Sequence, residues 1–314
     1  MSAELLINVT PSESRVALIE NGILQEIHIE RHTKRGLVGN IYRGKVSRVL
    51  PGMQAAFVDI GLDKAAFLHA SDIAIHSEVE EEVASSHLPK KDIRDLVRDG
   101  QNIVVQVVKD QIGTKGARLT TDITIPSRYL VFMPSVTHVG VSQRIEDEQE
   151  RERLKSLVQC FCSENGGFIL RTAAEGVKEQ ELVQDADFLR RLWEKIRSRM
   201  KNKSHILYED LPLARRVLRD FVGTTLSLQE LQLFTKEYVP ELNRLLEYYP
   251  GDRPIFDLYD VENECQRSLE RRVDLKSGGY LIIDQTEAMT TIDINTGAFV
   301  GHRNLEETIF NTNI

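Results

Sequence analysis

Apolar runs separated by turn residues dominate the start of the chain. Residues 15–20 (Arg-Val-Ala-Leu-Ile-Glu) and 23–30 (Ile-Leu-Gln-Glu-Ile-His-Ile-Glu) flank Asn21-Gly22. Asn-Gly supplies two residues that accept positive φ, which a tight two-residue turn requires. The pattern therefore predicts a β-hairpin.

Several short apolar runs, each ending in turn residues, follow between residues 40 and 123. They are 40–50, 55–61, 65–70, 102–110 and 118–123. Short strands at this spacing are typical of a small β-barrel. The charged stretch 78–91 interrupts the runs, and we expect it to be a surface loop that leads into a short helix near 93–97.

Beyond Thr121 the period changes, and helical spacing alternates with short strands. Ser227-Leu-Gln-Glu230 has the spacing of a capping box, which marks the start of a helix. The predicted helices are 147–160, 178–200, 227–249 and 260–272, and the predicted strands are 128–133, 167–171, 278–284 and 289–296. The fold class predicted from the residues is therefore α+β with a barrel near the N-terminus.

Composition narrows the class of protein. The 314 residues include 40 Lys+Arg and 48 Asp+Glu, a net charge of −8, and 41% are hydrophobic. This length predicts two or three folding units. No apolar run approaches the ~20 residues that cross a bilayer, so no membrane span is expected. Three cysteines cannot build a disulfide framework, which favours a reducing, cytoplasmic location.

A negative net charge argues against indiscriminate nucleic-acid binding, so any such contact requires a local basic surface. Residues 31–48 offer one, with six cations and no acid. A cluster of this kind is also typical of a plain solvated face. The cations are Arg31, Lys34, Arg35, Arg43, Lys45 and Arg48.

Two aromatic residues fall on the polar side of predicted barrel strands. In 55–60, alternation places Ala56, Val58 and Ile60 together, so Phe57 faces the other way, and Phe67 does the same in 65–70. Exposed rings can stack on bases at about 1–3 kcal/mol each. The alternative, which the residues alone favour, is that the rings cover the barrel mouth or contact a neighbouring domain. Lys109, Lys115 and Arg118, on the closing strand and its turn, could follow a phosphate backbone.

Two further groups could bind ligands. Asp293 and Asn295 project from one face of the strand 289–296, and their oxygens suit a hard cation such as Mg²⁺. Arg171-Thr172 sets a guanidinium beside a hydroxyl, which could grip a terminal phosphate. The alternative is that Asp293 is a surface charge and Arg171 a surface arginine at a strand end.

Several motifs, taken together, resemble the ribonuclease E/G family over nearly the whole chain. The motifs are 39–45 (Gly-Asn-Ile-Tyr-Arg-Gly-Lys), 55–59 (Ala-Ala-Phe-Val-Asp), Lys115-Gly116, 129–131 (Tyr-Leu-Val), 171–173 (Arg-Thr-Ala), 273–288 and 290–296 (Thr-Thr-Ile-Asp-Ile-Asn-Thr). The start of the chain and residues 54–71 are most similar to the ribonuclease G branch of this family.

The resemblance implies an α+β multidomain fold. Residues 1–35 and 215–285 would form a discontinuous, shortened RNase-H-like subdomain, into which an OB-fold RNA-binding barrel (36–121) and an α+β 5′-sensor (122–214) are inserted. Residues 286–314 would begin an incomplete deoxyribonuclease-I-like catalytic subdomain. Between Phe221 and Leu231 the chain is shorter than the family pattern.

The resemblance also implies a function. Family members cleave single-stranded RNA with Mg²⁺, preferring 5′-monophosphorylated ends, in ribosomal RNA maturation and messenger decay. Asp293 would be a metal-binding catalytic residue and Asn295 its orienting partner. Phe57, Phe67, Lys109 and Lys115 would contact RNA. The 5′-phosphate sensor would comprise Val131, Arg144, Arg171 and Thr172.

Two hypotheses follow from the residues that the sequence lacks. The family's second catalytic carboxylate and the later cysteine pair, through which two subunits of a homodimer share zinc, are absent from these 314 residues. The chain is therefore expected to be either an endoribonuclease of this family in shortened form or an inactive RNA-binding remnant. The resemblance implies a homodimer for the family, whose shared zinc ion would require that cysteine pair.

Overall fold

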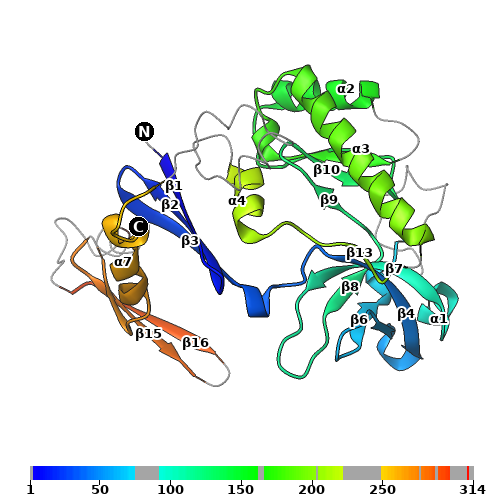
Figure 1. The fold of residues 1–314 in the computed structure, drawn as a ribbon, viewed down its shortest axis with the longest axis horizontal. Coiled ribbons are helices and arrows are strands. Elements are labelled where there is room, and N and C mark those ends of the chain that lie inside the picture. Colours follow the sequence, from blue (N-terminus) through cyan, green and yellow to red (C-terminus); the bar gives the residue numbers. More distant parts are fainter. Residues whose placement is uncertain are drawn as a thin grey trace.

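A computed structural model of the chain describes residues 3–74, 92–161, 166–202, 204–221, 249–275, 277–286, 289–297 and 310. The described strands form four sheets, and Figure 1 shows the helices beside them. Among the described residues, no helix has both the length and the apolar character needed to cross a bilayer. The predicted mixture of α and β structure is confirmed.

The N-terminal sheet is antiparallel, in the order β1 (Ala3–Val9), β2 (Glu13–Glu20), β3 (Ile23–Arg31). The turn between β2 and β3 is Asn21-Gly22, with φ of 51° and 78°. The predicted hairpin is therefore confirmed, together with the reason for its glycine. Strand β1 was not predicted.

Two short helices, α6 (Ile255–Leu258) and α7 (Val261–Ser268), pack on the N-terminal sheet. Their fully buried Phe256 and Val261 share a core with strand residues. Arg15 of β2 binds Glu262 of α7 at 2.9 Å. The predicted helix 260–272 therefore ends four residues early, and the chain then enters β14 (Arg272–Asp274).

A closed barrel follows the N-terminal sheet, which confirms the predicted barrel. Its strands pair in the order β4-β5-β6-β8-β7, and β4 also pairs with β7 to close it. The strands are β4 (Ile41–Leu50), β5 (Ala55–Asp59), β6 (Ala66–His69), β7 (Asn102–Lys109) and β8 (Arg118–Thr120). The predicted short helix is α1 (Ile93–Leu96), and most of the charged stretch 78–91 lies outside the described residues.

Closure depends on a close approach between β6 and the start of β8. A Cβ atom on Gly116 would lie 2.0 Å from the carbonyl oxygen of Ala65. Only glycine leaves room for such a backbone contact. Gly116 therefore permits the parallel pairing of β6 with β8, in which Phe67 is opposite Arg118.

After the barrel comes a unit of mixed α and β structure, which we call the second mixed unit. It contains a four-stranded sheet in the order β11-β12-β10-β9. Helices α2 (Glu148–Phe161) and α3 (Glu179–Lys201) pack on this sheet, close to the predicted 147–160 and 178–200. The strands are β9 (Ile125–Pro126), β10 (Leu130–Met133), β11 (Val139–Val141) and β12 (Gly167–Leu170). After α3, β13 (Ile206–Tyr208) pairs with β4 and so joins this unit to the barrel.

A cluster of charges, which we call the charge hub, connects three units: the N-terminal sheet, the barrel and the second mixed unit. The carboxylates of Glu30 on β3 and Asp210 after β13 are each approached by two arginines at 3.6–3.9 Å. Arg216 lies between both carboxylates, and its helix α4 (Leu213–Phe221) begins with the Leu213 amide donating to Glu30 at 3.1 Å. The hub arginines are Arg35, Arg216 and Arg219.

The C-terminal sheet pairs β14 with β15 (Tyr280–Gln285) and β15 with β16 (Thr290–Asn295). The domain boundary predicted after residue 285 thus falls at the turn of this hairpin. The predicted helix 227–249 lies almost entirely outside the described residues, as does most of the shortened stretch 221–231. The RNase-H-like and deoxyribonuclease-I-like subdomains stay predictions.

Acid should weaken the contact between α2 and the segment before α3. Arg153 hydrogen-bonds the Glu150 carboxylate and lowers its pKa from 4.5 to about 2, helped by the Gly176 amide. Because the folded pKa is depressed, the stabilisation is present above pH 4.5 and is lost as the pH falls toward 2.

We predict that Glu150→Gln lowers the free energy of unfolding by about 1 kcal/mol at pH 7 and by progressively less in acid. Urea denaturation across this pH range measures the effect. Glu148→Gln is the matched control, since Glu148 is on the same helix but its side chain is 78% exposed. Equal losses for both variants would contradict the assignment.

Candidate nucleic-acid interface

One row of side chains crosses the barrel from β4 to β7. Each member is the pairing partner of the next on the neighbouring strand. In order they are Arg48, Phe57, Phe67, Arg118 and Lys109. With strands about 4.8 Å apart, the row spans about 19 Å. We call it the barrel row; it has two rings in the middle and cations at both ends.

The rings face as alternation predicted. Ala56, Val58, Ala66 and Leu68 are fully buried in the barrel core, whereas Phe57 and Phe67 are half-buried and absent from that core. The two rings pack edge to face, with centroids 6.2 Å apart and planes at 69°. They therefore form an aromatic platform on the barrel surface, outside the barrel core, and their contact with RNA stays a prediction.

Polar residues beside Phe67 extend the platform. The His69 ring lies 6.5 Å from Phe67, and its Nδ1 is 2.8 Å from the Ser71 hydroxyl. Arg118 donates two hydrogen bonds to Asp72, at 2.8 and 3.1 Å, and that carboxylate raises the pKa of Arg118. Arg118 was predicted as a phosphate-following cation, but its place opposite Phe67 depends on the β6–β8 pairing. His69 was not predicted as a binding residue, although alternation places it on the same strand face as Phe67.

The predicted lysines differ in their relation to the barrel row. Lys109 is exposed at its end. Lys115 is exposed on the loop between β7 and β8, where it forms an isolated bridge with Ile112. Lys64 donates from Nζ to the Gly113 carbonyl at 2.5 Å and so fixes that loop. Lys115 is therefore held next to the barrel row without being part of it.

The basic cluster 31–48 does not form a single surface, contrary to expectation. Arg35 belongs to the charge hub, and Arg43 donates to the Met200 carbonyl at the end of α3. Lys45 is opposite Asp59 on β5, so a carboxylate faces it. Of these cations, Arg48 alone belongs to the barrel row, because the six side chains leave two strands and a connecting turn in different directions.

A second polar cluster lies where β12 ends, and the structure brings three of the four predicted sensor residues close together there. The Thr172 hydroxyl is 3.2 Å from the Ser142 hydroxyl, which accepts the amide N–H of Arg144 at 3.3 Å. Arg171 immediately precedes Thr172. Ser142 was not predicted, because nothing in the local pattern singles it out.

Val131, the fourth predicted sensor residue, lies on the sheet face away from the helices. It pairs with Ile169, and both are half-buried, whereas the neighbours Leu130 and Phe132 are buried under α2 and α3. Arg171 follows Ile169 by two positions, so the backbone continues toward the same face. This face of the sheet and the cluster around Thr172 make up the candidate end-binding site.

A turn of four residues, 127–130, supports Arg171. Arg171 donates from its main chain to the Tyr129 carbonyl at 2.8 Å and from Nη1 to the Ser127 carbonyl at 2.6 Å. Asp185 of α3 accepts from the same turn. Burial raises the pKa of Asp185, against the opposing effect of these hydrogen bonds and of the Arg128 charge.

Asp293 and Asn295 lie together on β16, as alternation predicted. The Asn295 amide donates to the Asp293 carboxylate at 3.0 Å. Both lie on the strand face opposite Ile292 and Ile294. Oxygen donors suit Mg²⁺, which commonly takes one or two carboxylates plus substrate phosphate. The described residues contain no group of three or more His, Cys, Asp or Glu side chains that could hold a metal.

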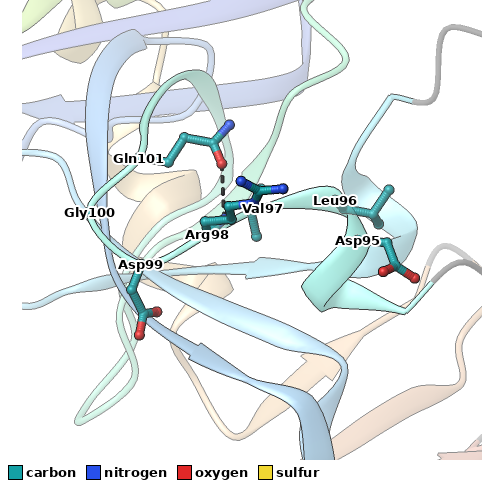
Figure 2. A pocket seen from close by; sticks show the side chains of 7 residues that line it. All are labelled: Asp95, Leu96, Val97, Arg98, Asp99, Gly100 and Gln101. Carbon is teal, nitrogen blue, oxygen red and sulfur yellow. Dashed lines mark hydrogen bonds between the residues drawn. The ribbon is translucent and has the colours of Figure 1, made fainter.

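Two hollows in the described surface are not used by these clusters. One, of about 560 Å³, is lined by residues 95–101 (Figure 2). Its two carboxylates do not converge, and Asp99 accepts from the Val49 amide at 2.7 Å. The other, of about 450 Å³, lies between the barrel and β13, beside Arg35 and His205.

An OB-type barrel that carries outward rings flanked by cations is characteristic of proteins that bind single-stranded nucleic acid. The S1 RNA binding domain model matches residues 37–121. The ribonuclease E/G family model matches residues 124–314, which is more than half of the chain. The chain therefore belongs to the ribonuclease E/G family.

Its similarity is higher to ribonuclease G than to ribonuclease E, as the motifs indicated. Ribonuclease G of Salmonella typhimurium (strain SL1344) and of Escherichia coli (strain K12) are both 66% identical, over 100% of this chain and 66% of theirs. Ribonuclease E of Escherichia coli (strain K12) is 34% identical, over 99% of this chain and 30% of its own. The chain thus spans 66% of the length of these ribonuclease G relatives.

We predict that Phe57→Ala and Phe67→Ala each weaken binding of single-stranded RNA by about 1–3 kcal/mol, because each removes a stacking surface. The cost in folding stability should be about 1 kcal/mol, the value of the edge-to-face pair. Fluorescence anisotropy and thermal melting measure the two effects.

Phe132→Ala is the contrasting control, because Phe132 is 2% exposed in the sheet–helix core. Its loss should cost about 3–5 kcal/mol of stability. If Phe57→Ala melts like Phe132→Ala, the ring is part of a core rather than of a binding surface.

Proposed function

We propose that the chain binds single-stranded RNA and acts as a Mg²⁺-dependent endoribonuclease that prefers 5′-monophosphorylated ends. The observation that carries this proposal is the barrel row, whose rings and cations match the two features of a single strand that every sequence shares. Bases present π-faces for stacking, and phosphates present negative charge. Membership of the ribonuclease E/G family supports the cleavage step.

In this proposal, the RNA strand is bound along the barrel, and its 5′ end is recognised at a separate site. Phe57 and Phe67 stack bases, while Arg48, Lys109, Lys115 and Arg118 follow the phosphates. Arg171 and Thr172, with Arg144 and Val131 beside them, bind the terminal phosphate. A guanidinium offers a fork of N–H donors that matches phosphate oxygens, and a nearby hydroxyl adds a further donor.

Cleavage requires a nucleophile at the scissile phosphate. Mg²⁺, when bound, lowers the pKa of a coordinated water and offsets negative charge on the phosphate. Asp293 would hold the ion through a carboxylate oxygen. Asn295 would fix the orientation of that carboxylate through its amide hydrogen bond. The proposed substrates are ribosomal RNA precursors and messenger RNA, and the proposed location is the cytoplasm.

A second candidate is an RNA-binding protein without cleavage. It is favoured by the exposure of Asp293, which belongs to no group of three or more possible metal ligands among the described residues. A homodimer also stays a proposal.

We predict that Arg171→Lys reduces the preference for 5′-monophosphate over 5′-hydroxyl RNA by about 10–100-fold, because lysine cannot donate as a fork. Competition between two oligonucleotides of one sequence measures the preference. Arg197→Lys, a 56% exposed position on α3, is the control and should change nothing. An unchanged preference in Arg171→Lys would remove this residue from end recognition.

We predict that Asp293→Asn lowers Mg²⁺-dependent cleavage of a short 5′-monophosphorylated RNA by more than about 100-fold, because a metal ligand is lost. RNA affinity should be unchanged. Asp274→Asn, an exposed aspartate on the same sheet, is the control. Binding without cleavage by the unmodified chain would support the second candidate instead.

A further inference from the structure

We infer that Asp185 is a positioning residue for the terminal-phosphate site and acts through Arg171. This inference rests on the proposed function, because it assumes that Arg171 binds a 5′-phosphate. Asp185 is in the N-terminal third of α3, whereas Arg171 follows β12, so no local sequence pattern links them. The link is made by the turn 127–130, which both residues contact.

The first step of the argument is the contact between Asp185 and the turn. One carboxylate oxygen, Oδ2, accepts three hydrogen bonds, from the Ser127 hydroxyl at 2.5 Å and from the amides of Tyr129 and Leu130 at 3.0 Å each. Hydrogen bonds to a charged acceptor are stronger and shorter than neutral ones. Three donors meeting at one atom fix both the position and the orientation of the turn.

The second step is the contact between the turn and Arg171. The Tyr129 carbonyl accepts the Arg171 amide at 2.8 Å, and the Ser127 carbonyl accepts from Nη1 at 2.6 Å. The main chain and the guanidinium of Arg171 are therefore both held by the turn. An arginine that must meet phosphate oxygens as a fork depends on the plane of its guanidinium, and here the turn sets that plane.

The third step concerns what else could hold the turn. Ser127 is itself buried, and its hydroxyl is also 2.9 Å from the Leu130 carbonyl, while its amide donates to that carbonyl at 2.8 Å. These bonds close the turn but do not connect it to the helices. Asp185 adds a polar connection to α3, and the side chains of Tyr129 and Leu130 pack in one core with buried residues of that helix. The position of Arg171 is therefore fixed relative to the rigid helix α3.

The test uses the full chain and two fluorescent oligoribonucleotides of one sequence, one with a 5′-monophosphate and one with a 5′-hydroxyl. Anisotropy gives the ratio of their dissociation constants for each variant. Asp185→Asn should lower this ratio by at least about fivefold, because the charged acceptor is lost. Its affinity for the 5′-hydroxyl RNA should be unchanged, since that strand depends on the barrel.

Two further variants keep the inference testable. Ser127→Ala removes one donor without touching the helix, so it serves if Asp185→Asn does not fold, and it should also lower the ratio. Asp187→Asn is the matched control, because Asp187 lies on the same helix and pairs with Arg190 at 3.2 Å. Thermal melting reports whether each variant is folded.

A double variant separates positioning from an independent effect. If Asp185 acts through Arg171, Asp185→Asn should have no effect on the ratio in the Arg171→Lys background. An equal reduction in both backgrounds would overturn the inference, as would a folded Asp185→Asn with the original ratio. A ratio of one in the unmodified chain would instead refute the proposed end recognition itself, and with it the role of Asp185.

Discussion

The charge hub is the constraint on which the relative placement of the units depends. Glu30 belongs to the N-terminal sheet, Arg35 to the connection into the barrel, and Arg216 to the helix after the second mixed unit. Ion pairs at 3.6–3.9 Å, partly removed from solvent, add little net stability, because desolvation offsets the attraction. They do disfavour arrangements that would leave a buried carboxylate unpaired. The hub therefore acts more on which arrangement forms than on how stable it is.

Glycine and strand pairing extend this constraint to the surface that we propose binds RNA. Gly39 has a φ of 90°, and a Cβ there would lie 3.1 Å from Asp210. The chain can therefore pass the hub and enter β4 directly. A register shift between Val46 and Arg48 in the β4–β5 pairing then aligns Arg48 with Phe57, and Gly116 lets Arg118 align with Phe67. The barrel row thus depends on a strand irregularity and on a close backbone approach.

Local periodicity predicted the elements that are long or regularly alternating. The hairpin at Asn21-Gly22, most barrel strands, α2 and α3 all carry such patterns, and the outward rings followed from alternation alone. Strands β9, β11 and β13 have two or three residues each, too few to show a period, and their existence depends on partners far along the chain. Ser142 and Asp185 were missed for a related reason, because their significance lies only in what the fold brings to them.

The two proposed RNA contacts recognise different features of the RNA, and this difference decides which contact discriminates between substrates. Stacking on Phe57 and Phe67 and attraction to flanking cations depend little on sequence and act on any single strand. A fork of donors aimed at one terminal phosphate rejects an end that lacks that phosphate, because its hydrogen bonds are then left unmade. Discrimination between substrates should therefore arise at Arg171, whose geometry is fixed by hydrogen bonds, and strength of binding at the barrel.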